Sequence, residues 1–302
     1  MTTIKPRVQI KNLQKKTSST LIADEISLNL HPKEVFVLVG PKSSGKTLLA
    51  KMVLNLVHKT HGEVKFTGTR ADIGSVLDGQ HFIPNSTPFK TLVQSATFNG
   101  REVNDKHILN VLNLLGLKGL KRKKIKVLAQ NQVSRLKVAN AIFTKPQVLI
   151  LDNPFEGLTD EESLGVRLIL RALADHLEIA VLITSPTLEG VEEICDTIGI
   201  INDGLMVTVK SYNELAQRAG VKGIAVLSKN PVLTANVIET ELNLPAVPAG
   251  DKVIVQTNIE RAQEVYNCLV KNNVLVFGVE RVDKTITEIY FSILNERKFI
   301  LH

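Results

Sequence analysis

The residues most able to do chemistry lie in one glycine-rich loop. Gly40, Gly45, Lys46 and Thr47 match the spacing G-x-x-x-x-G-K-[ST]. In such a loop, backbone N–H groups at the start of a helix bind phosphate oxygens, the lysine contacts the terminal phosphates and the threonine hydroxyl binds Mg²⁺. An apolar run, residues 35–39, precedes the loop, and apolar residues follow at helical spacing: Leu48, Leu49, Met52, Val53 and Leu56. These flanks argue against a chance Gly/Ser-rich loop and predict a nucleotide-binding site, or a descendant of one.

A second pattern supplies a carboxylate that could act with this loop. The apolar run at residues 148–151 ends on Asp152, as in a buried parallel strand that terminates in an acid. Such an aspartate can orient the Mg²⁺ that Thr47 also binds. The loop alone would also fit a kinase or a GTPase. The segment before Asp152 narrows this choice, because it reads as a polar turn opening a helix with these inward side chains: Leu136, Val138, Ala139, Ala141 and Ile142.

Together these segments resemble the ATP-binding cassettes of ABC transporters. In that family a short signature, here residues 128–132, opens a helix that leads to the second Walker motif at Asp152. Residues 156–162 and 181–207 resemble the segments that follow, and the similarity runs from about Val8 to Ala216. The resemblance implies an α/β fold of the P-loop NTPase cassette type, with a mixed-sheet core, an antiparallel N-terminal part and a helical insertion.

The sequence resembles one subfamily more closely, the bacitracin- and lantibiotic-type ABC exporter ATPases. Residues 73–92 and the ending at 282–294 carry this similarity. In that subfamily a carboxylate commonly replaces the glutamine of the Q-loop, and Asp78 occupies that position. The resemblance implies a subunit that binds ATP and Mg²⁺ for export of peptides, antibiotics or other amphiphiles. Asp78 would then join Thr47 and Asp152 at the metal.

The resemblance places nucleotide contacts in two separate stretches. Ala129, Asn131 and Gln132 of the signature would contact nucleotide held by a second cassette, because each composite site takes its Walker groups from one subunit and its signature from the other. One cassette per chain therefore implies pairing with a second ABC ATPase subunit, as a homodimer or a heterodimer. The phosphates would be held by the residues of the glycine-rich loop: Gly40, Pro41, Lys42, Ser43, Ser44, Gly45, Lys46, Thr47 and Leu48.

Two departures from the family pattern concern hydrolysis. Asn153 replaces the glutamate that polarises the attacking water, and an amide cannot accept a proton, so a general-base contribution of about 10²–10⁴-fold is lost. Pro186 replaces the histidine that contacts the γ-phosphate. The motifs on either side leave little room for an alignment slip. Glu156 or Asp160 could substitute as the base, but both follow the strand end and are expected to face solvent.

Further departures concern binding. Ala129 replaces the signature serine that donates to the partner's γ-phosphate, and Asn131 crowds a position where the family has glycine. A lost hydrogen bond to a charged group is worth roughly 1.5–3 kcal/mol. Thr159 replaces an aspartate, and Ser43 stands where cassettes usually have a third glycine. No aromatic residue lies near Thr17, where one would stack on adenine.

These features lead to two alternative functions. The first is an ATP-binding subunit of an exporter that binds Mg²⁺-ATP with impaired hydrolysis and couples to a membrane permease. The second is a non-hydrolysing regulatory or assembly protein that uses ATP as a structural ligand. An ordinary active ATPase would need a rescued base, so enzymatic activity stays open.

The composition of the chain restricts the kinds of partner that we expect it to bind. The 302 residues carry a net charge of +7, which favours anionic partners. The densest basic cluster, residues 118–126, is either a solvated loop or a contact for anionic headgroups. Nucleic acid is not expected, because aromatic residues are 4% of the chain and no binding motif occurs. No apolar run approaches the roughly 20 residues that span a bilayer, so we expect a cytoplasmic protein, peripheral on the inner face of the membrane.

The pattern predicts two domains, a cassette at 1–219 with its helical insertion at about 88–130, and a small α/β domain at 220–302. In the second domain we expect three strands, two main helices, a loop at 244–251 and a final helix. Cys195 and Cys268 lack metal or redox spacing and are expected to be small buried hydrophobes on helices.

In this family the Q-loop and the helical insertion receive a coupling helix from the permease. We therefore expect Asp78, Phe82, Phe89 and Leu92 to surround an exposed apolar groove, the kind of patch that marks a binding site. The alternative is that Phe82 and Phe89 pack under the insertion as core residues.

Overall fold

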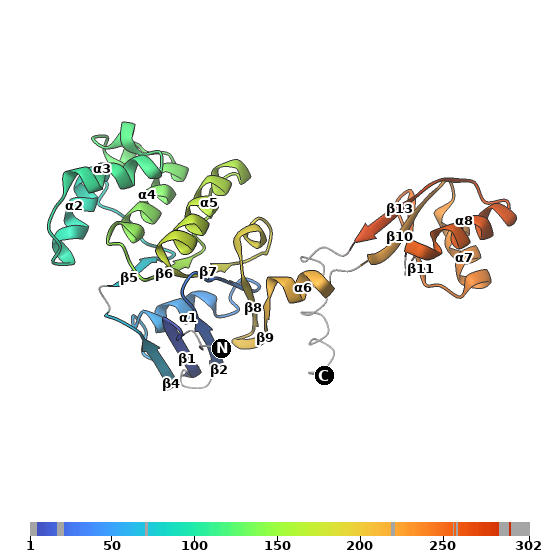
Figure 1. Ribbon diagram of the computed structural model, residues 1–302, viewed down its shortest axis with the longest axis horizontal. Coiled ribbons are helices and arrows are strands. Elements are labelled where there is room, and N and C mark those ends of the chain that lie inside the picture. The colour runs from blue at the N-terminus through green and yellow to red at the C-terminus, as the bar shows by residue number, and fades with distance from the viewer. Residues whose placement is uncertain are drawn as a thin grey trace. The chain divides into compact units, whose positions relative to one another are not determined.

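The computed structural model describes residues 5–16, 21–69, 72–218, 221–255, 257, 259–283 and 290 (Figure 1). The chain divides into two compact units, Met1–Tyr212 and Asn213–His302. Along the chain, the boundary between the units falls at the start of helix α6 (Tyr212–Arg218), whereas the sequence predicts it at the other end of this helix, after residue 219. Gly220, the expected stop of this helix, lies outside the described residues.

The first unit contains a nine-stranded mixed sheet in the order β4-β1-β2-β9-β8-β3-β7-β6-β5. Strands β8, β3, β7, β6 and β5 pair in parallel, whereas β1 pairs antiparallel with both β2 and β4, and β8 with β9. The sheet thus joins a parallel core to an antiparallel N-terminal part, as expected. The strands are β1 (Val8–Lys16), β2 (Leu21–Leu30), β3 (Val35–Val39), β4 (His61–Phe66), β5 (Ile73–Val76), β6 (Val148–Asp152), β7 (Ala180–Ser185), β8 (Thr197–Asn202) and β9 (Leu205–Ser211).

Three neighbouring strands, β3, β7 and β6, position the functional residues. Every residue in them is buried, which explains why their sequences are almost continuously apolar. Val39 lies beside Ser185, and Asp152 lies beside Thr184. The loops that leave these strands therefore start side by side at one edge of the sheet, including the glycine-rich loop after Val39.

Helices α1 (Lys46–Val53), α4 (Gln130–Phe143) and α5 (Asp160–Leu177) complete this unit's core, together with the insertion. Helix α1 buries Leu49, Met52 and Val53 as expected. Leu56 was expected on the same stripe, which is wrong: the helix ends before it and the side chain is 62% exposed. The prediction for α4 is confirmed, because all five of its expected inward residues are buried.

The insertion consists of α2 (Pro88–Phe98), α3 (Asp105–Leu114) and two short 3-10 turns, Lys118–Leu120 and Ile125–Val127. Thr87 and Asn104 cap α2 and α3 by accepting hydrogen bonds from backbone N–H groups in the first turn. Leu92 was expected at an exposed groove, which is wrong. Helix α2 packs against α3 and α4, and Leu92 is fully buried.

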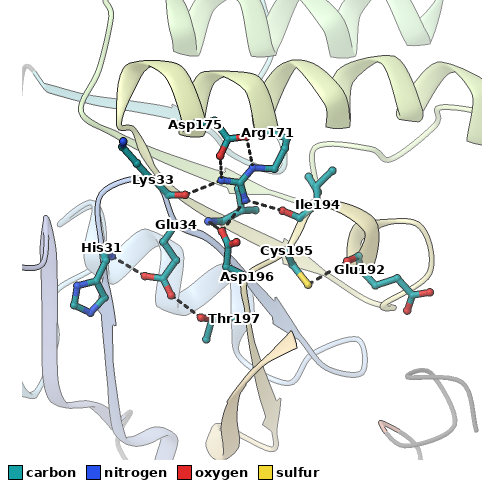
Figure 2. A network of polar contacts seen from close by, with 11 residues as sticks. His31, Lys33, Glu34, Arg171, Asp175, Glu192, Ile194, Cys195, Asp196 and Thr197 are labelled. Atoms are coloured by element: carbon teal, nitrogen blue, oxygen red, sulfur yellow. Dashed lines mark hydrogen bonds and ion pairs between the residues drawn. The ribbon is translucent and has the colours of Figure 1, made fainter. Parts of the chain in front are cut away.

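A polar network holds the start of β3 in place, at the end of the strand opposite to the glycine-rich loop (Figure 2). The Arg171 guanidinium on α5 donates to the Lys33 carbonyl at 2.7 Å and to Asp196 Oδ2 at 2.6 Å. Asp196 Oδ2 also accepts from the Val35 N–H at 2.8 Å. Glu34 accepts from Thr197 Oγ1 at 2.6 Å. Helix α5 and the first residues of β3 and β8 are therefore tied together.

After α6, the second unit has the element order β-α-β-β-α-β: β10 (Val221–Ser228), α7 (Pro231–Leu242), β11 (Ala246–Ala249), β12 (Lys252–Val255), α8 (Ala262–Lys271) and β13 (Val276–Asp283), with a 3-10 turn at Ile259–Arg261. The strands form an antiparallel sheet in the order β11-β12-β10-β13. Its core joins the sheet to both helices through Ile224, Val226, Ile238, Val265 and Leu269.

The expected loop at 244–251 contains strand β11, so that prediction is wrong. Ala246 pairs with Val255, and β11 lies at the edge of the sheet, where Pro248 is tolerated because one side of the strand needs no ladder hydrogen bond. The expected final helix falls outside the described residues, apart from Tyr290.

Both cysteines are free. Cys195 is buried, and burial raises the pKa of its thiol to about 12. It follows the 3-10 turn Val191–Ile194 rather than lying within a helix, and Cys268 on α8 is only half-buried. Among the described residues no helix combines the length and the apolar character needed to cross a bilayer.

Candidate functional site

The glycine-rich loop connects β3 to α1 and requires two of its glycines. A Cβ on Gly40 would lie 2.1 Å from the Ile201 carbonyl oxygen, so only glycine fits. Gly45 precedes α1 with φ 101°, in the region that favours glycine. Ser43 also has a positive φ, 65°. The loop therefore takes a left-handed turn at the position where a third glycine is usual, and serine adopts it at some cost in strain.

Lys46 points into this loop. Its Nζ donates to the carbonyl oxygens of Gly40 and Pro41, both at 2.7 Å, and to Ser44 Oγ at 3.1 Å. Burial lowers the pKa of Lys46, and the negative charge of Asp152 partly opposes this shift. The loop thus holds a partly desolvated cation that lacks a bonded anion, an arrangement suited to phosphate oxygens.

A cavity of about 390 Å³ lies beside the loop. Six of the nine predicted loop residues line it, Ser43 to Leu48. Lys42 does not line it and is exposed. Sequence reasoning missed the other lining residues. Lys51 was detectable, because it follows Thr47 by one helical turn, but Ile22 and Val57 come from outside the motif and carry no local signal.

Asp152 and Thr47 meet as predicted. Thr47 Oγ1 donates to Asp152 Oδ1 at 3.1 Å. Thr184 Oγ1, a residue that sequence reasoning did not single out, donates to the same oxygen at 2.5 Å. Asp152 is 3% exposed, and its Oδ2 is buried without a hydrogen-bond partner. A buried carboxylate oxygen without a partner is costly, so this atom fits a divalent cation with oxygen ligands.

Asn153 and Pro186 reach the same edge of the sheet, because each directly follows the strand end that carries Asp152 or Thr184. Asp78 follows β5, the neighbour of β6, and is exposed. Within the described ranges, no group of three or more His, Cys, Asp or Glu side chains is placed to hold a metal ion. A cation here would take Thr47 and Asp152 as protein ligands and complete its shell with phosphate and water oxygens.

The two carboxylates considered as substitute bases are not bonded to this cluster. Glu156 and Asp160 are both exposed, as expected. Asp160 begins α5, and the Glu156 carbonyl accepts from Ser134 Oγ at 3.5 Å. Neither side chain has a hydrogen bond to Asp152, Thr47 or Thr184.

The signature residues lie at the start of α4 and do not line the cavity beside the loop. Asn131 donates from its Nδ2 to Glu162 Oε1. Glu162 Oε2 accepts from the Thr159 N–H at 3.1 Å, and Thr159 Oγ1 accepts from the Glu162 N–H at 3.3 Å. The hydrogen bond from the Thr159 N–H lowers the pKa of Glu162, and the hydrogen bond from Asn131 lowers it further. Thr159, noted as a lost aspartate, therefore serves as the N-cap of α5.

Comparison with known proteins agrees with this geometry. A family model described as ABC transporter matches residues 23–156, which include both the glycine-rich loop and Asp152. The ABC transporter ATP-binding protein YcbN of Bacillus subtilis is 28% identical over 95% of this chain and 97% of its own length. The lantibiotic transport ATP-binding protein SrtF of Streptococcus pyogenes is 28% identical over 75% of this chain and 97% of its own. The bacitracin transport ATP-binding protein BcrA of Enterococcus faecalis is 27% identical over 70% of this chain and 71% of its own length.

A crystal structure of a nucleotide-free ATP-binding cassette from an ABC transporter superposes with a TM-score of 0.64, covering 71% of this chain and 94% of that one at 17% identity. This likeness establishes the fold. The geometry of the glycine-rich loop, the burial of Asp152, the order of the strands and the relatives all agree with this fold. The chain therefore has the fold of an ABC transporter ATP-binding cassette and is related to ABC transporter ATP-binding proteins, among them those of bacitracin and lantibiotic transport.

Proposed function

We propose that this ATP-binding subunit holds Mg²⁺-ATP through the loop Gly40–Leu48 and Asp152, hydrolyses it poorly, and serves an exporter of peptides, antibiotics or other amphiphiles. The observation that carries the binding proposal is the buried, unpartnered Oδ2 of Asp152 beside Thr47. The names of the bacitracin and lantibiotic relatives support the class of cargo.

Different residues of the site would bind the cation and the phosphates. Bound Mg²⁺ would neutralise the charge of the terminal phosphates. Thr47 and Asp152 would hold the cation, while Lys46 and the N–H groups at the start of α1 would hold phosphate oxygens. Ile22 and Val57 would supply an aliphatic wall beside the nucleotide. This wall lacks the stacking of an aromatic ring, so we expect weak binding.

Impaired hydrolysis follows from the two residues at the strand ends. Asn153 cannot accept a proton from water, and Pro186 carries no side-chain donor for the γ-phosphate. ATP-binding subunits of this family generally dimerise and act with a permease. We propose a second, more competent ABC ATPase as the partner, because a homodimer would carry the same replacements in both of its sites.

The permease is proposed to contact the insertion at a groove of about 570 Å³. Phe89 lines this groove, together with Thr87, Lys90, Asp105, Leu109, Lys121 and Arg122. Phe89 is half-buried, so part of its ring is open to a partner. Phe82 is half-buried too, but it does not line the groove.

Replacing Phe89 by alanine is expected to release the protein from membranes that contain its permease, with affinity lowered about tenfold or more, as for an aromatic interface anchor. Sedimentation of native membranes with the tagged variant measures this. The matched control is Phe98→Ala, because Phe98 ends the same helix, is 90% exposed and does not line the groove.

The thermal melting point of each variant separates docking from folding. Loss of the fold in Phe89→Ala would mark Phe89 as a core residue. Membrane association that survives Phe89→Ala and fails only when Lys123 and Lys124, which do not line the groove, are neutralised would contradict docking and point to lipid electrostatics.

Purification of the tagged chain from native membranes, with identification of the bound subunits, tests the function as a whole. A polytopic membrane protein and a second ABC ATPase in stoichiometric amounts are expected. If the chain binds Mg²⁺-ATP but neither subunit is recovered with it, the alternative function, a regulatory or assembly protein, would be favoured instead.

A further inference from the structure

We propose that Thr184 is a positioning residue that fixes the carboxylate of Asp152, so that Oδ2 alone faces a divalent cation. This inference rests on the proposed Mg²⁺-ATP site and adds to it a residue outside the loop and the Asp152 motif. Thr184 lies on β7, the strand beside Asp152, with 1% of its surface exposed.

The direction of the hydrogen bonds follows from the donors available. The Asn153 N–H is shared between the Thr184 carbonyl oxygen at 3.1 Å and Thr184 Oγ1 at 3.2 Å. A carboxylate oxygen can only accept, so the hydroxyl proton of Thr184 goes to Asp152 Oδ1, at 2.5 Å. The Thr47 hydroxyl donates to the same oxygen at 3.1 Å. Both side-chain donors thus converge on Oδ1.

This convergence distinguishes the two carboxylate oxygens. Rotation of the carboxylate about its Cβ–Cγ bond away from this orientation would break both hydrogen bonds inside a buried site, where such bonds are strong. Oδ2 is held in place without a protein partner. The carboxylate is therefore oriented before the cation arrives, and no ordering is needed on binding.

The chemistry of β7 supports a role for the hydroxyl rather than for the shape of the side chain. The strand runs Ala180, Val181, Leu182, Ile183 before Thr184, and all of these residues are buried. Valine has almost the same shape as threonine and suits a buried parallel strand equally well. A buried hydroxyl is costly unless it is hydrogen-bonded, and here its hydrogen bond goes to the candidate metal ligand.

Three variants test this proposal by calorimetry of ATP binding, each with Mg²⁺ and with EDTA. In Thr184→Val the gain in affinity that Mg²⁺ provides is expected to fall about tenfold, the worth of one hydrogen bond to a charged group. Affinity in EDTA should stay within about twofold, because Lys46 and the loop amides are untouched. Thr184→Ser, which keeps the hydroxyl, should retain the gain.

The matched control is Thr234→Val. Thr234 is fully buried in the second unit, where its Oγ1 donates to the Asn230 carbonyl at 2.9 Å, so this change removes a buried hydroxyl away from the site. It should leave both affinities unchanged. Thermal melting checks each fold. If Thr184→Val does not fold, Thr184→Ala takes its place in the comparison with serine.

An unchanged Mg²⁺ gain in Thr184→Val would overturn the proposal while leaving the proposed function intact. Equal losses with Mg²⁺ and with EDTA would also overturn it, because they would indicate general disruption. A wild type without any Mg²⁺-dependent ATP binding would instead refute the proposed function.

Discussion

Replacing Lys46 by alanine is expected to abolish ATP binding that the wild type shows weakly in the presence of Mg²⁺. The Lys46 ammonium is half-buried and bonded only to neutral oxygens, so phosphate oxygens would gain charge-assisted hydrogen bonds from it. Two such bonds at about 1.5–3 kcal/mol each correspond to a loss of affinity of more than about 100-fold, beyond the reach of calorimetry for a weak ligand.

Lys42→Ala is the matched control for Lys46→Ala. It removes the same charge from the same loop and keeps the backbone N–H, but the Lys42 side chain is exposed and does not line the cavity, so we expect affinity close to that of the wild type. The thermal melting point of the nucleotide-free protein checks that each variant folds. Absence of wild-type binding at millimolar ATP would refute the site.

The second large effect concerns turnover. The isolated protein is expected to release phosphate from ATP at or near the background rate, because Asn153 and Pro186 together remove the base and the γ-phosphate contact. A missing general base alone is worth about 10²–10⁴-fold. Asn153→Glu should recover little, because Pro186 and the signature residues Ala129 and Asn131 remain in both sites of a homodimer.

A steady-state phosphate-release assay measures this, with Asp152→Ala as the control for contaminating ATPases. Equal, low rates in the wild type and in Asp152→Ala are expected. A robust wild-type rate that collapses in Asp152→Ala would show that another group supplies the base, and Glu156 and Asp160 would be the first residues to replace.

The sequence predicts the parts of the site that are local in the chain. Gly40 to Thr47 form a turn in which Gly45 is needed by its own backbone, at φ 101°, and Asp152 ends an apolar strand, so both patterns can be recognised without knowledge of the fold. The buried face of α4 was equally accessible, because helical spacing encodes it.

The missed residues depend on neighbours that are distant in the chain. Thr184 meets Asp152 only because β7 pairs with β6, and Ile22 reaches the cavity from β2. A polar residue inside an apolar strand was the available signal for Thr184. Leu92 was misplaced because its environment is set by α3 and α4. Strand β11 was missed because Pro248 reads as a loop signal until the edge position is known.

The carboxylate of Glu162 joins the start of α4 to the start of α5, through Asn131 on one oxygen and Thr159 on the other. These two helix starts should therefore open together in local unfolding. In Glu162→Ala, we expect faster amide hydrogen–deuterium exchange in the first turns of both helices, with exchange in β7 unchanged, as mass spectrometry of peptides would detect. Faster exchange confined to α5 would mean that the helix starts open separately. If they open together, a ligand that orders the signature would also slow exchange at Thr159, although that residue follows a different strand of the sheet.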